Sequence, residues 1–234
     1  DVCSSDLAMS HEFRTPLNAV IGFADVMHGE HFGSLGHAKY REYAADIVAS
    51  ARHLAQMIDD VLDMAKIEAG RLELHEERAR PGELMDRAVR MVKPRAEEAG
   101  HVLAVSYPSE RVEIRVDGRK FVQILINLLA NAIKFTEASG RIDLAASLTQ
   151  GRALAFTVTD TGIGMTAEDQ ATALEPFGQV NAASSAGRLG SGLGLSIVSA
   201  LVELHGGTLA IASAPGTGTT VTVTVPANRV ESFV

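Results

Sequence analysis

The feature that most limits how this chain can fold is a regular apolar stripe between residues 40 and 65. Apolar side chains recur there at alternating steps of three and four residues, the spacing of a coiled-coil-like seam along one side of a helix. The stripe consists of Tyr40, Tyr43, Ile47, Ala51, Leu54, Ile58, Val61 and Ala65. Gly70 follows, at a position where helices commonly end. The sequence therefore predicts one long helix whose apolar side needs a partner.

A second helical pattern precedes this stripe, from about Leu7 to Met27, and Pro16 interrupts it. Because proline lacks a backbone N–H, we expect a kink there. Residues 28–38 contain three glycines and three histidines and are predicted to form a connecting loop. Such a hairpin is too thin to bury its seam alone, so we expect two copies to pair into a four-helix bundle, a homodimer. Packing of the hairpin on the rest of its own chain is the alternative.

Beyond about residue 70 the composition changes to a mixture of helix and strand patterns. Helices are predicted over residues 81–99 and 193–205, and over a segment that Asp117 caps at its start. Strands are predicted over residues 102–107, 111–116, 141–148, 154–159, 208–212 and 219–225. Helices over one face of a mixed sheet make an α/β sandwich. We therefore predict an α+β chain, with an antiparallel helical hairpin over residues 1–70 and an α/β sandwich over residues 71–234.

Two asparagines and a lysine share one face of the helix that Asp117 begins. Asn127, Asn131 and Lys134 recur at i, i+4 and i+7, so one stripe presents two amides and an ammonium. An amide oxygen is a hard ligand suited to Mg²⁺, and a lysine is a point charge for phosphate. We predict Asn131 as a magnesium ligand, Asn127 as an auxiliary contact to phosphate or metal-bound water, and Lys134 as a phosphate contact. The other faces of the helix carry predicted core residues: Leu125, Leu128, Leu129 and Ile133.

A first glycine cluster follows a predicted strand and begins with Asp160. A carboxylate only accepts hydrogen bonds, which suits an exocyclic amine such as N6 of adenine. Gly162 and Gly164 allow the backbone to approach a ring closely. Alone, this Asp-x-Gly-x-Gly pattern could be a plain turn after a strand. Together with the amide and lysine stripe, it predicts a pocket for ATP with magnesium.

A second glycine cluster precedes the last predicted helix, whose first amides could receive phosphate oxygens. It does not match the dinucleotide-binding pattern, because Leu195 stands where the third glycine would be. No Walker-type Gly-Lys-Ser/Thr loop occurs either. Residues 165–190 lack strong periodicity and end in small and polar side chains, so we predict a mobile lid. The predicted nucleotide contacts beside this lid are Gly190, Gly192, Leu193 and Gly194.

Near the start of the chain, His11 stands in the segment Ser-His-Glu-Phe-Arg-Thr-Pro-Leu. An imidazole is neutral enough near pH 7 to act as a nucleophile toward a γ-phosphate. Glu12 beside it can accept the other ring N–H, which fixes the tautomer. A zinc-protease motif is excluded, because Thr15 stands where the second histidine would be. The chain has eight histidines, and we assign no role to the others because they lack such a context.

Together these segments resemble the transmitter core of bacterial sensor histidine kinases. The similarity covers roughly residues 8–226 and includes the family's boxes in their usual order. The matching segments are residues 10–17 (H box), 127–136 (N box), 160–164 (adenine-binding glycine box), 175–177 (F box), 190–194 (lid-closing glycine box) and 216–219 (a last glycine turn). The resemblance implies that Phe177 and Thr219 also belong to the nucleotide site. The family's F box often has a phenylalanine where Leu174 stands, which leaves the packing of the lid open.

This resemblance implies ATP-dependent autophosphorylation of His11 and transfer to an aspartate on the receiver domain of a response regulator. Glu12 would serve as acid and base. Glu12 and Thr15 would also orient a water that removes phosphate from the regulator, although Thr15 could instead only bond back into its helix. Whether His11 is phosphorylated by its own or by the partner chain stays open. Residues 34–43 are similar to alphaproteobacterial cell-cycle kinases.

Composition narrows the possible partners. A net charge of −8 and a pI near 5.5 argue against nucleic acid, and the single cysteine suits a reducing compartment. No apolar run approaches the length of a membrane span. We therefore expect a cytoplasmic protein, or the cytoplasmic part of a longer, membrane-attached sensor.

Two other classes of function remain as alternatives. One is a scaffold that binds nucleotide structurally and controls a partner kinase, which the intact His11 and glycine clusters disfavour. The other is a nucleotide-driven clamp like those of topoisomerases, which the H box on a dimerising hairpin disfavours.

Overall fold

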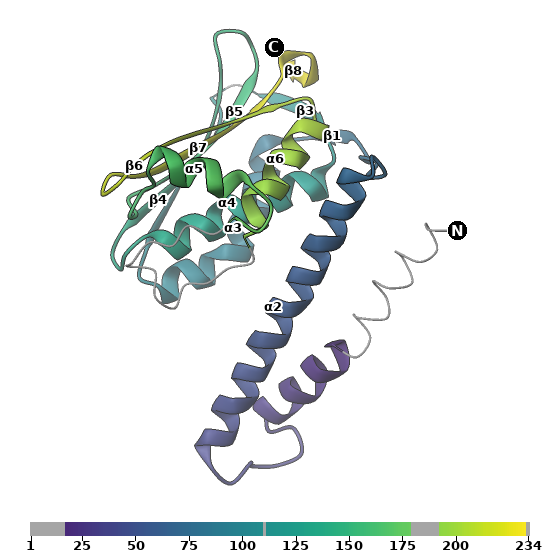
Figure 1. The fold of residues 1–234 in the computed structure, drawn as a ribbon, viewed down its shortest axis with the longest axis vertical. Coiled ribbons are helices and arrows are strands. Elements are labelled where there is room, and N and C mark those ends of the chain that lie inside the picture. Colours follow the sequence, from purple (N-terminus) through teal and green to yellow (C-terminus); the bar gives the residue numbers. More distant parts are fainter. Residues whose placement is uncertain (1–16, 110, 179–191, 233–234) are drawn as a thin grey trace. The chain divides into compact units, whose positions relative to one another are not determined.

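The computed structural model describes residues 17–109, 111–178 and 192–232 (Figure 1). The chain divides into two compact units, Asp1–Leu72 and Glu73–Val234. The predicted kink at Pro16 lies outside the described residues. None of the helices in the described part of the chain is long and apolar enough to cross a membrane.

The first unit is a helical hairpin, as the periodicity predicts. Residues 17–28 are helical, and helix α2 spans Ala38–Glu68 (Figure 1). The side chain of His37 caps α2 by accepting a hydrogen bond from the backbone N–H of Lys39. Gly70 has a φ of +63° just past the end of the helix, which confirms the predicted stop.

The two helices of the hairpin meet through small side chains. Ala24 on the first helix is buried, and on the facing side of α2 three residues spaced i, i+4 and i+7 are buried: Ala44, Val48 and Ala51. An exposed ion pair joins the helices, with Arg52 Nη2 lying 2.9 Å from Asp25 Oδ2. Short side chains let the two backbones approach closely, so this contact buries little apolar area.

Most of the predicted seam lies on a different side of α2 and is exposed. Tyr40 and Tyr43 are 57% and 56% exposed, and four further seam residues are also exposed: Ile47, Leu54, Val61 and Ala65. Only Ala51 of the predicted seam is buried inside the hairpin. The hairpin therefore does not bury this stripe by itself, which is what the sequence led us to expect.

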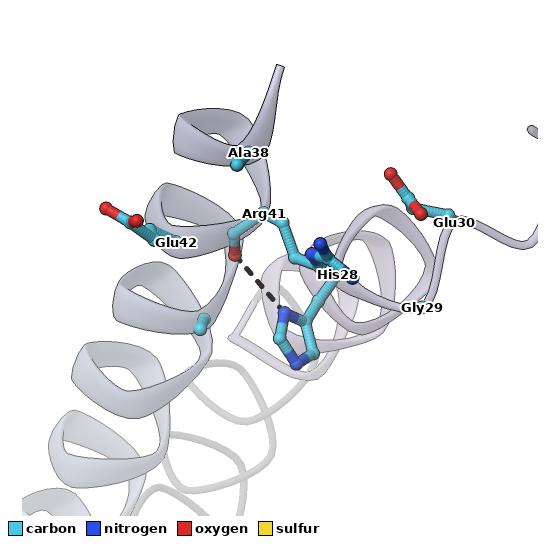
Figure 2. Close-up of a pocket in the computed structure, with 7 residues that line it drawn as sticks. His28, Gly29, Glu30, Ala38, Arg41 and Glu42 are labelled. Atoms are coloured by element: carbon cyan, nitrogen blue, oxygen red, sulfur yellow. Dashed lines mark hydrogen bonds between the residues drawn. The ribbon is translucent and has the colours of Figure 1, made fainter. Parts of the chain in front are cut away.

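The turn of the hairpin is held by side chain to backbone bonds (Figure 2). As Figure 2 shows, His28 Nδ1 donates to the carbonyl oxygen of Arg41 at 3.2 Å. In the loop, Glu30 Oε1 accepts from the backbone N–H of Leu35 at 3.1 Å. The first bond ties the end of the first helix to α2, and the second stabilises the loop between them. An open hollow of about 630 Å³ lies beside them, lined by His28, Gly29, Glu30, Ala38, Arg41, Glu42 and Ala45.

The second unit contains two sheets and four helices in its described part. In chain order its elements are β1 (Glu77–Ala79), α3 (Pro81–Glu98), β2 (Val102–Ser106), β3 (Val112–Val116), α4 (Gly118–Phe135), β4 (Arg141–Leu148), β5 (Leu154–Asp160), α5 (Ala167–Leu174), α6 (Gly194–Leu204), β6 (Thr208–Ala214), β7 (Gly218–Val225), the 3₁₀ turn η1 (Ala227–Arg229) and β8 (Val230–Ser232). The main sheet has the order β2-β4-β5-β7-β6, in which only the β2–β4 pair is parallel. A small antiparallel sheet has the order β1-β3-β8.

Helices α3, α4 and α6 cover one face of the main sheet, which confirms the predicted α/β sandwich (Figure 1). The side chains of β5 alternate, so Phe156 and Val158 point to the helices and Thr157 to the other face. Phe121 of α4 packs on Phe156 with ring centroids 4.8 Å apart. The predicted core residues of α4, Leu125, Leu128, Leu129 and Ile133, are all buried.

The sequence analysis did not predict helix α5 or the short strands β1 and β8. Helix α5 lies inside the segment 165–190, where we found no strong periodicity and predicted no helix. Thr166 and Asp169 form a capping box at its start, a signal readable from the sequence. Strands β1 and β8 have three residues each, too few to show an alternating pattern, and they form only because β3 lies between them.

Candidate functional site

Helix α4 carries the two predicted amides on its accessible side. Asn127 and Asn131 are both partly buried. The side-chain nitrogen of Asn127 is fully shielded from solvent and has no hydrogen-bond partner within the described part of the chain. Asn131 faces the start of α6, because its Nδ2 lies 3.7 Å from where a Cβ atom on Gly194 would be. A buried amide without a partner is costly, so this stripe is suited to receive a polar ligand.

Lys134 lies one turn beyond Asn131, near the end of α4. Its Nζ stands over the ring of Phe135, 4.7 Å from the ring centroid. Burial lowers the pKa of Lys134, because partial loss of water disfavours the ammonium. An anion beside the ammonium would reverse that effect, so Lys134 is well placed to gain from a phosphate.

Asp160 ends β5 and is 8% exposed. Its Oδ1 accepts hydrogen bonds from the backbone N–H of Gly162 at 2.8 Å and of Thr219 at 3.3 Å. Burial raises the pKa of Asp160, and these two bonds oppose the rise. Both recorded bonds use Oδ1, so Oδ2 is left to accept from another donor. Thr219 thus lies beside Asp160, although 59 positions separate them in the chain.

The glycines next to Asp160 are needed first by the protein's own backbone. A Cβ atom on Gly162 would lie 2.5 Å from the carbonyl oxygen of Phe135, at the end of α4. Gly164 has a φ of +67°, and a Cβ atom there would lie 1.9 Å from the carbonyl oxygen of Ala214. These residues hold the loop tightly between α4 and the β6–β7 turn.

A hollow of about 360 Å³ opens at this edge of the sheet. Its lining residues are Thr159, Asp160, Ala212, Ser213, Ala214, Thr217, Gly218, Thr219 and Thr220. Sequence reasoning missed Ser213, whose Oγ lies 2.9 Å from Thr219 Oγ1 and accepts from the backbone N–H of Met165. Only the register of the β6–β7 hairpin, which pairs Ser213 with Thr219, could have revealed it.

Phe177 and Gly192 lie together across the undescribed segment 179–191. Phe177 is exposed and has a φ of +61°, and Gly192 has a φ of +73°. A Cβ atom on Gly192 would lie 2.7 Å from the backbone carbon of Phe177, so only glycine fits there. The two flanks of the predicted lid are therefore in backbone contact.

Helix α6 begins at Gly194 without a capping side chain. Leu193, the N-cap residue, is 1% exposed, so its side chain belongs to the core and only its backbone can meet a ligand. Uncapped N–H groups at the start of a helix favour an anion. Within the described residues, no group of three or more histidine, cysteine, aspartate or glutamate side chains could hold a metal ion.

The structure brings most of the predicted nucleotide contacts into one unit. The described members are Asn127, Asn131, Lys134, Asp160, Gly162, Gly164, Phe177, Gly192, Leu193, Gly194 and Thr219. The remaining predicted site residues, His11, Glu12, Thr15 and Gly190, lie outside the described residues.

Comparison with known families identifies the class of each unit. Residues 116–229 match the family of histidine kinase-, DNA gyrase B- and HSP90-like ATPases. Residues 8–70 match the His Kinase A (phospho-acceptor) domain. The second unit thus contains an ATP-binding domain of this class. With the phospho-acceptor domain before it, the chain belongs to the histidine kinases.

Curated relatives agree with this family. The chain is 45% identical over 221 residues to the non-motile and phage-resistance protein of Caulobacter vibrioides, covering 93% of this chain and 26% of that protein. It is 45% identical to an uncharacterised sensor-like histidine kinase of Rhizobium meliloti, covering 94% of this chain and 42% of the relative. It is 39% identical to the cell-division control histidine kinase PdhS of Brucella anthropi, covering 95% of this chain and 22% of that kinase. The chain therefore spans less than half the length of these relatives. The predicted similarity to alphaproteobacterial cell-cycle kinases is confirmed.

Solved structures show the same fold. Full-length ShkA in complex with AMPPNP is 34% identical, with a TM-score of 0.78, and the match covers 95% of this chain and 45% of ShkA. The histidine kinase AdeS of Acinetobacter baumannii has a TM-score of 0.64 at 22% identity, over 93% of this chain and 98% of AdeS. The helical hairpin followed by a mixed α/β domain is thus the fold of this family.

Proposed function

We propose that this chain phosphorylates its own His11 from ATP and passes the phosphoryl group to an aspartate on a response regulator. The observation that best supports this proposal is the convergence of three elements in the second unit. The amide stripe of α4 faces the uncapped start of α6, and Asp160 lies at the end of the neighbouring strand β5. The membership of the first unit in the phospho-acceptor family supports the role of His11.

In this proposal Asp160 binds the adenine end of the nucleotide. Its buried carboxylate would accept from the exocyclic amine through Oδ2, while Oδ1 stays bonded to Gly162 and Thr219. The hollow beside Ser213 gives room for part of the base. Phe177, at the flank of the lid, would cover the nucleotide once it is bound.

The phosphates would lie between α4 and α6. Asn131 would hold Mg²⁺ through its amide oxygen, and the unpaired amide of Asn127 would contact phosphate or a metal-bound water. Magnesium commonly needs only one or two protein ligands beside phosphate oxygens and water, so the residues present fit it. When bound, it would neutralise charge on the phosphates. Lys134 and the first amides of α6, around Gly194, would bind the phosphate oxygens.

The reaction itself is phosphoryl transfer to nitrogen. The neutral imidazole of His11 attacks the γ-phosphorus, a P–N bond forms, and the bond between the γ-phosphorus and the β,γ-bridging oxygen breaks to release ADP. Glu12 accepts the proton that the imidazole gives up. In the second step the aspartate of the receiver domain attacks the same phosphorus and the P–N bond breaks. Glu12 and Thr15 would also orient water for removal of phosphate from the regulator.

We further propose that the hairpin forms a homodimer through its exposed seam. Tyr40, Tyr43, Ile47, Leu54 and Val61 form an apolar stripe that the single hairpin leaves exposed. A second copy would cover the stripe and complete a four-helix bundle. Since the reaction consumes ATP, the proposal places this part of the protein in the cytoplasm.

Incubation with γ-labelled ATP tests the proposal directly. Wild-type protein should acquire an acid-labile, base-stable label that moves to a receiver domain, and His11→Gln should remain unlabelled while binding nucleotide normally. Nucleotide binding without any label would favour the alternative of a scaffold that binds nucleotide structurally and controls a partner kinase. Rapid ATP hydrolysis without a phospho-enzyme would favour the clamp. Equal labelling of wild type and His11→Gln would overturn the assignment of His11.

A further inference from the structure

His205, to which the sequence analysis assigned no role, is buried with both ring nitrogens in hydrogen bonds. Its Nε2 accepts from the backbone N–H of Asp117 at 3.1 Å, and its Nδ1 donates to the carbonyl oxygen of Leu201 at 2.7 Å. His205 is 1% exposed, and the edge of its ring meets Phe121 with the ring centroids 5.9 Å apart. Because a backbone N–H only donates and a carbonyl only accepts, the ring is neutral with its proton on Nδ1.

The position of His205 relates two helices of the nucleotide site. His205 is the C-cap residue of α6, and Asp117 is the N-cap residue of α4. At the opposite ends of the same helices, Asn131 faces Gly194. Helices α4 and α6 therefore run antiparallel, with the histidine joining them at one end and the phosphate-binding residues at the other.

We propose that His205 is a positioning residue that sets how far α6 slides along α4, and hence how Asn131 faces the first turn of α6. The proposal rests on the nucleotide site described above. A helix transmits a displacement along its axis almost undiminished, because its hydrogen bonds and close-packed neighbours resist compression. Loss of the Asp117–His205 bond would free one end of α6 and loosen the site at the other. A misplacement of about 1 Å is enough to weaken a catalytic arrangement strongly.

The charged surroundings of His205 make this bond sensitive to acid. Three charged groups face the ring from neighbouring elements: Asp117 at the start of α4, Arg229 of η1 and Glu76 before β1. Burial lowers the pKa of His205; Arg229 adds to the fall, and the Leu201 bond and the two carboxylates oppose it. The ring is therefore neutral at neutral pH. Protonation of Nε2 would remove the acceptor for the N–H of Asp117, so acid should weaken nucleotide binding.

Three substitutions of His205 distinguish the effect of its hydrogen bonds from the effect of its side-chain volume. His205→Gln can keep an acceptor near the position of Nε2, His205→Asn can keep only a donor near Nδ1, and His205→Phe fills the space with neither. Val92→Ala removes buried volume from α3 and serves as the stability control. The dissociation constant for magnesium–ATP is measured by calorimetry at a temperature where every variant is folded. We expect His205→Gln to bind within about twofold of wild type. His205→Asn and His205→Phe should bind about tenfold more weakly, because both lack the acceptor for the backbone N–H of Asp117.

The pH dependence of nucleotide affinity gives a second test of the positioning role. A residue that only filled space would not change this dependence. As the pH falls below 6.5, the ordinary value for a histidine pKa, wild-type affinity should fall more steeply than that of His205→Gln, which has no imidazole at this position. Equal affinities for all three variants and the Val92→Ala control would overturn the positioning role while leaving the nucleotide site intact. Failure of the wild type itself to bind nucleotide would overturn the proposed function and this inference together.

Discussion

The hairpin unit keeps its larger apolar side chains on the surface, whereas the ATP-binding unit buries its own between helices and a sheet. In the hairpin the buried contact consists of three alanines and one valine, and Tyr40, Leu54 and Val61 remain exposed. In the second unit, Phe121 and Phe156 are almost completely shielded from water. The second unit can therefore be stable as one copy, while the first leaves its seam exposed, and in our proposal a second copy covers it.

The largest effect is expected when charged side chains are placed on the exposed apolar seam of α2, where they should weaken self-association. Leu54→Glu combined with Val61→Glu should weaken self-association on the order of 1000-fold, because the dimer would lose burial of four half-exposed side chains, together roughly 4 kcal/mol. Analytical ultracentrifugation of the double variant measures the effect, with Glu68→Gln as an exposed control on the same helix. Nucleotide binding by the second unit should be unchanged. A double variant that still dimerises like wild type would show that the seam is not the interface.

The next test removes the proposed magnesium ligand from the self-contained unit. Asn131→Ala should lower the rate of autophosphorylation on the order of 100-fold, because charge on the transferring phosphoryl group would lose its preorganised partner. Asn127→Ala, one turn earlier, should have a clearly smaller effect, since we assign it an auxiliary contact. Initial rates of labelling at saturating magnesium measure both variants. Equal losses for both would contradict the assignment of Asn131, and neither variant should alter self-association.

Asp160→Asn probes the base end of the same site. Asparagine can still accept the bond from Gly162, but it replaces a charged acceptor with a neutral one for adenine. The affinity for ATP should fall roughly 30-fold, equivalent to about 2 kcal/mol for a hydrogen bond to a charged group. Calorimetric titration measures the change, and Asp143→Asn on the neighbouring strand is the control, because this carboxylate pairs with Arg141 rather than with Gly162 and Thr219. If Asp160→Asn lost the same affinity for GTP as for ATP, Asp160 would not be the acceptor for the adenine amine.

The smallest expected effects are on the free energy of unfolding. They compare one polar contact of each unit, the Asp117 cap of α4 and the Arg52–Asp25 ion pair of the hairpin. Burial would raise the pKa of Asp117, but hydrogen bonds from the backbone N–H groups of Lys120, His75 and Arg119 lower it overall. Asp117→Ala should lower the free energy of unfolding of the second unit by about 1–2 kcal/mol, the cost of a lost N-cap. Arg52→Ala, which breaks the exposed ion pair of the hairpin, should cost less than about 1 kcal/mol. Urea denaturation of each variant measures both values.

The pH dependence of the Asp117 effect follows from the direction of its shift. A carboxyl whose folded pKa lies below the ordinary value of 3.8 stabilises the fold above that value, and this stabilisation is lost as the pH falls through the folded pKa. The difference between wild type and Asp117→Ala should therefore be full at neutral pH and shrink only in strong acid. A difference that disappeared well above the ordinary carboxyl pKa of 3.8 would point to a group other than Asp117 as the titrating one.

Local patterns were enough to predict the long elements and to propose which residues form the site. The three- and four-residue spacing of apolar residues predicts α2, and Asp117 followed by a helical pattern predicts α4 with its amide stripe. Both signals lie within one element, so the chain neighbours alone determine them. Helix α5 could also have been found, because its capping box is local.

Other features could not be predicted because they depend on residues far apart in the chain. Ser213 joins the Asp160 pocket only through the register of β6 on β7. Strand β8 exists only where β3 offers it a pairing edge.

By itself, the sequence determined the family and the two-part architecture and predicted the chemical groups of the nucleotide site, because these depend on spacing along single helices and turns. Only the tertiary structure decided that α2 meets its neighbour through alanines and leaves the larger stripe exposed. It alone showed that His205 joins the far ends of the helices that carry Asn131 and Gly194. The physical reason is that a hydrogen bond between residues 88 positions apart depends on the packing of whole helices, which no local pattern encodes.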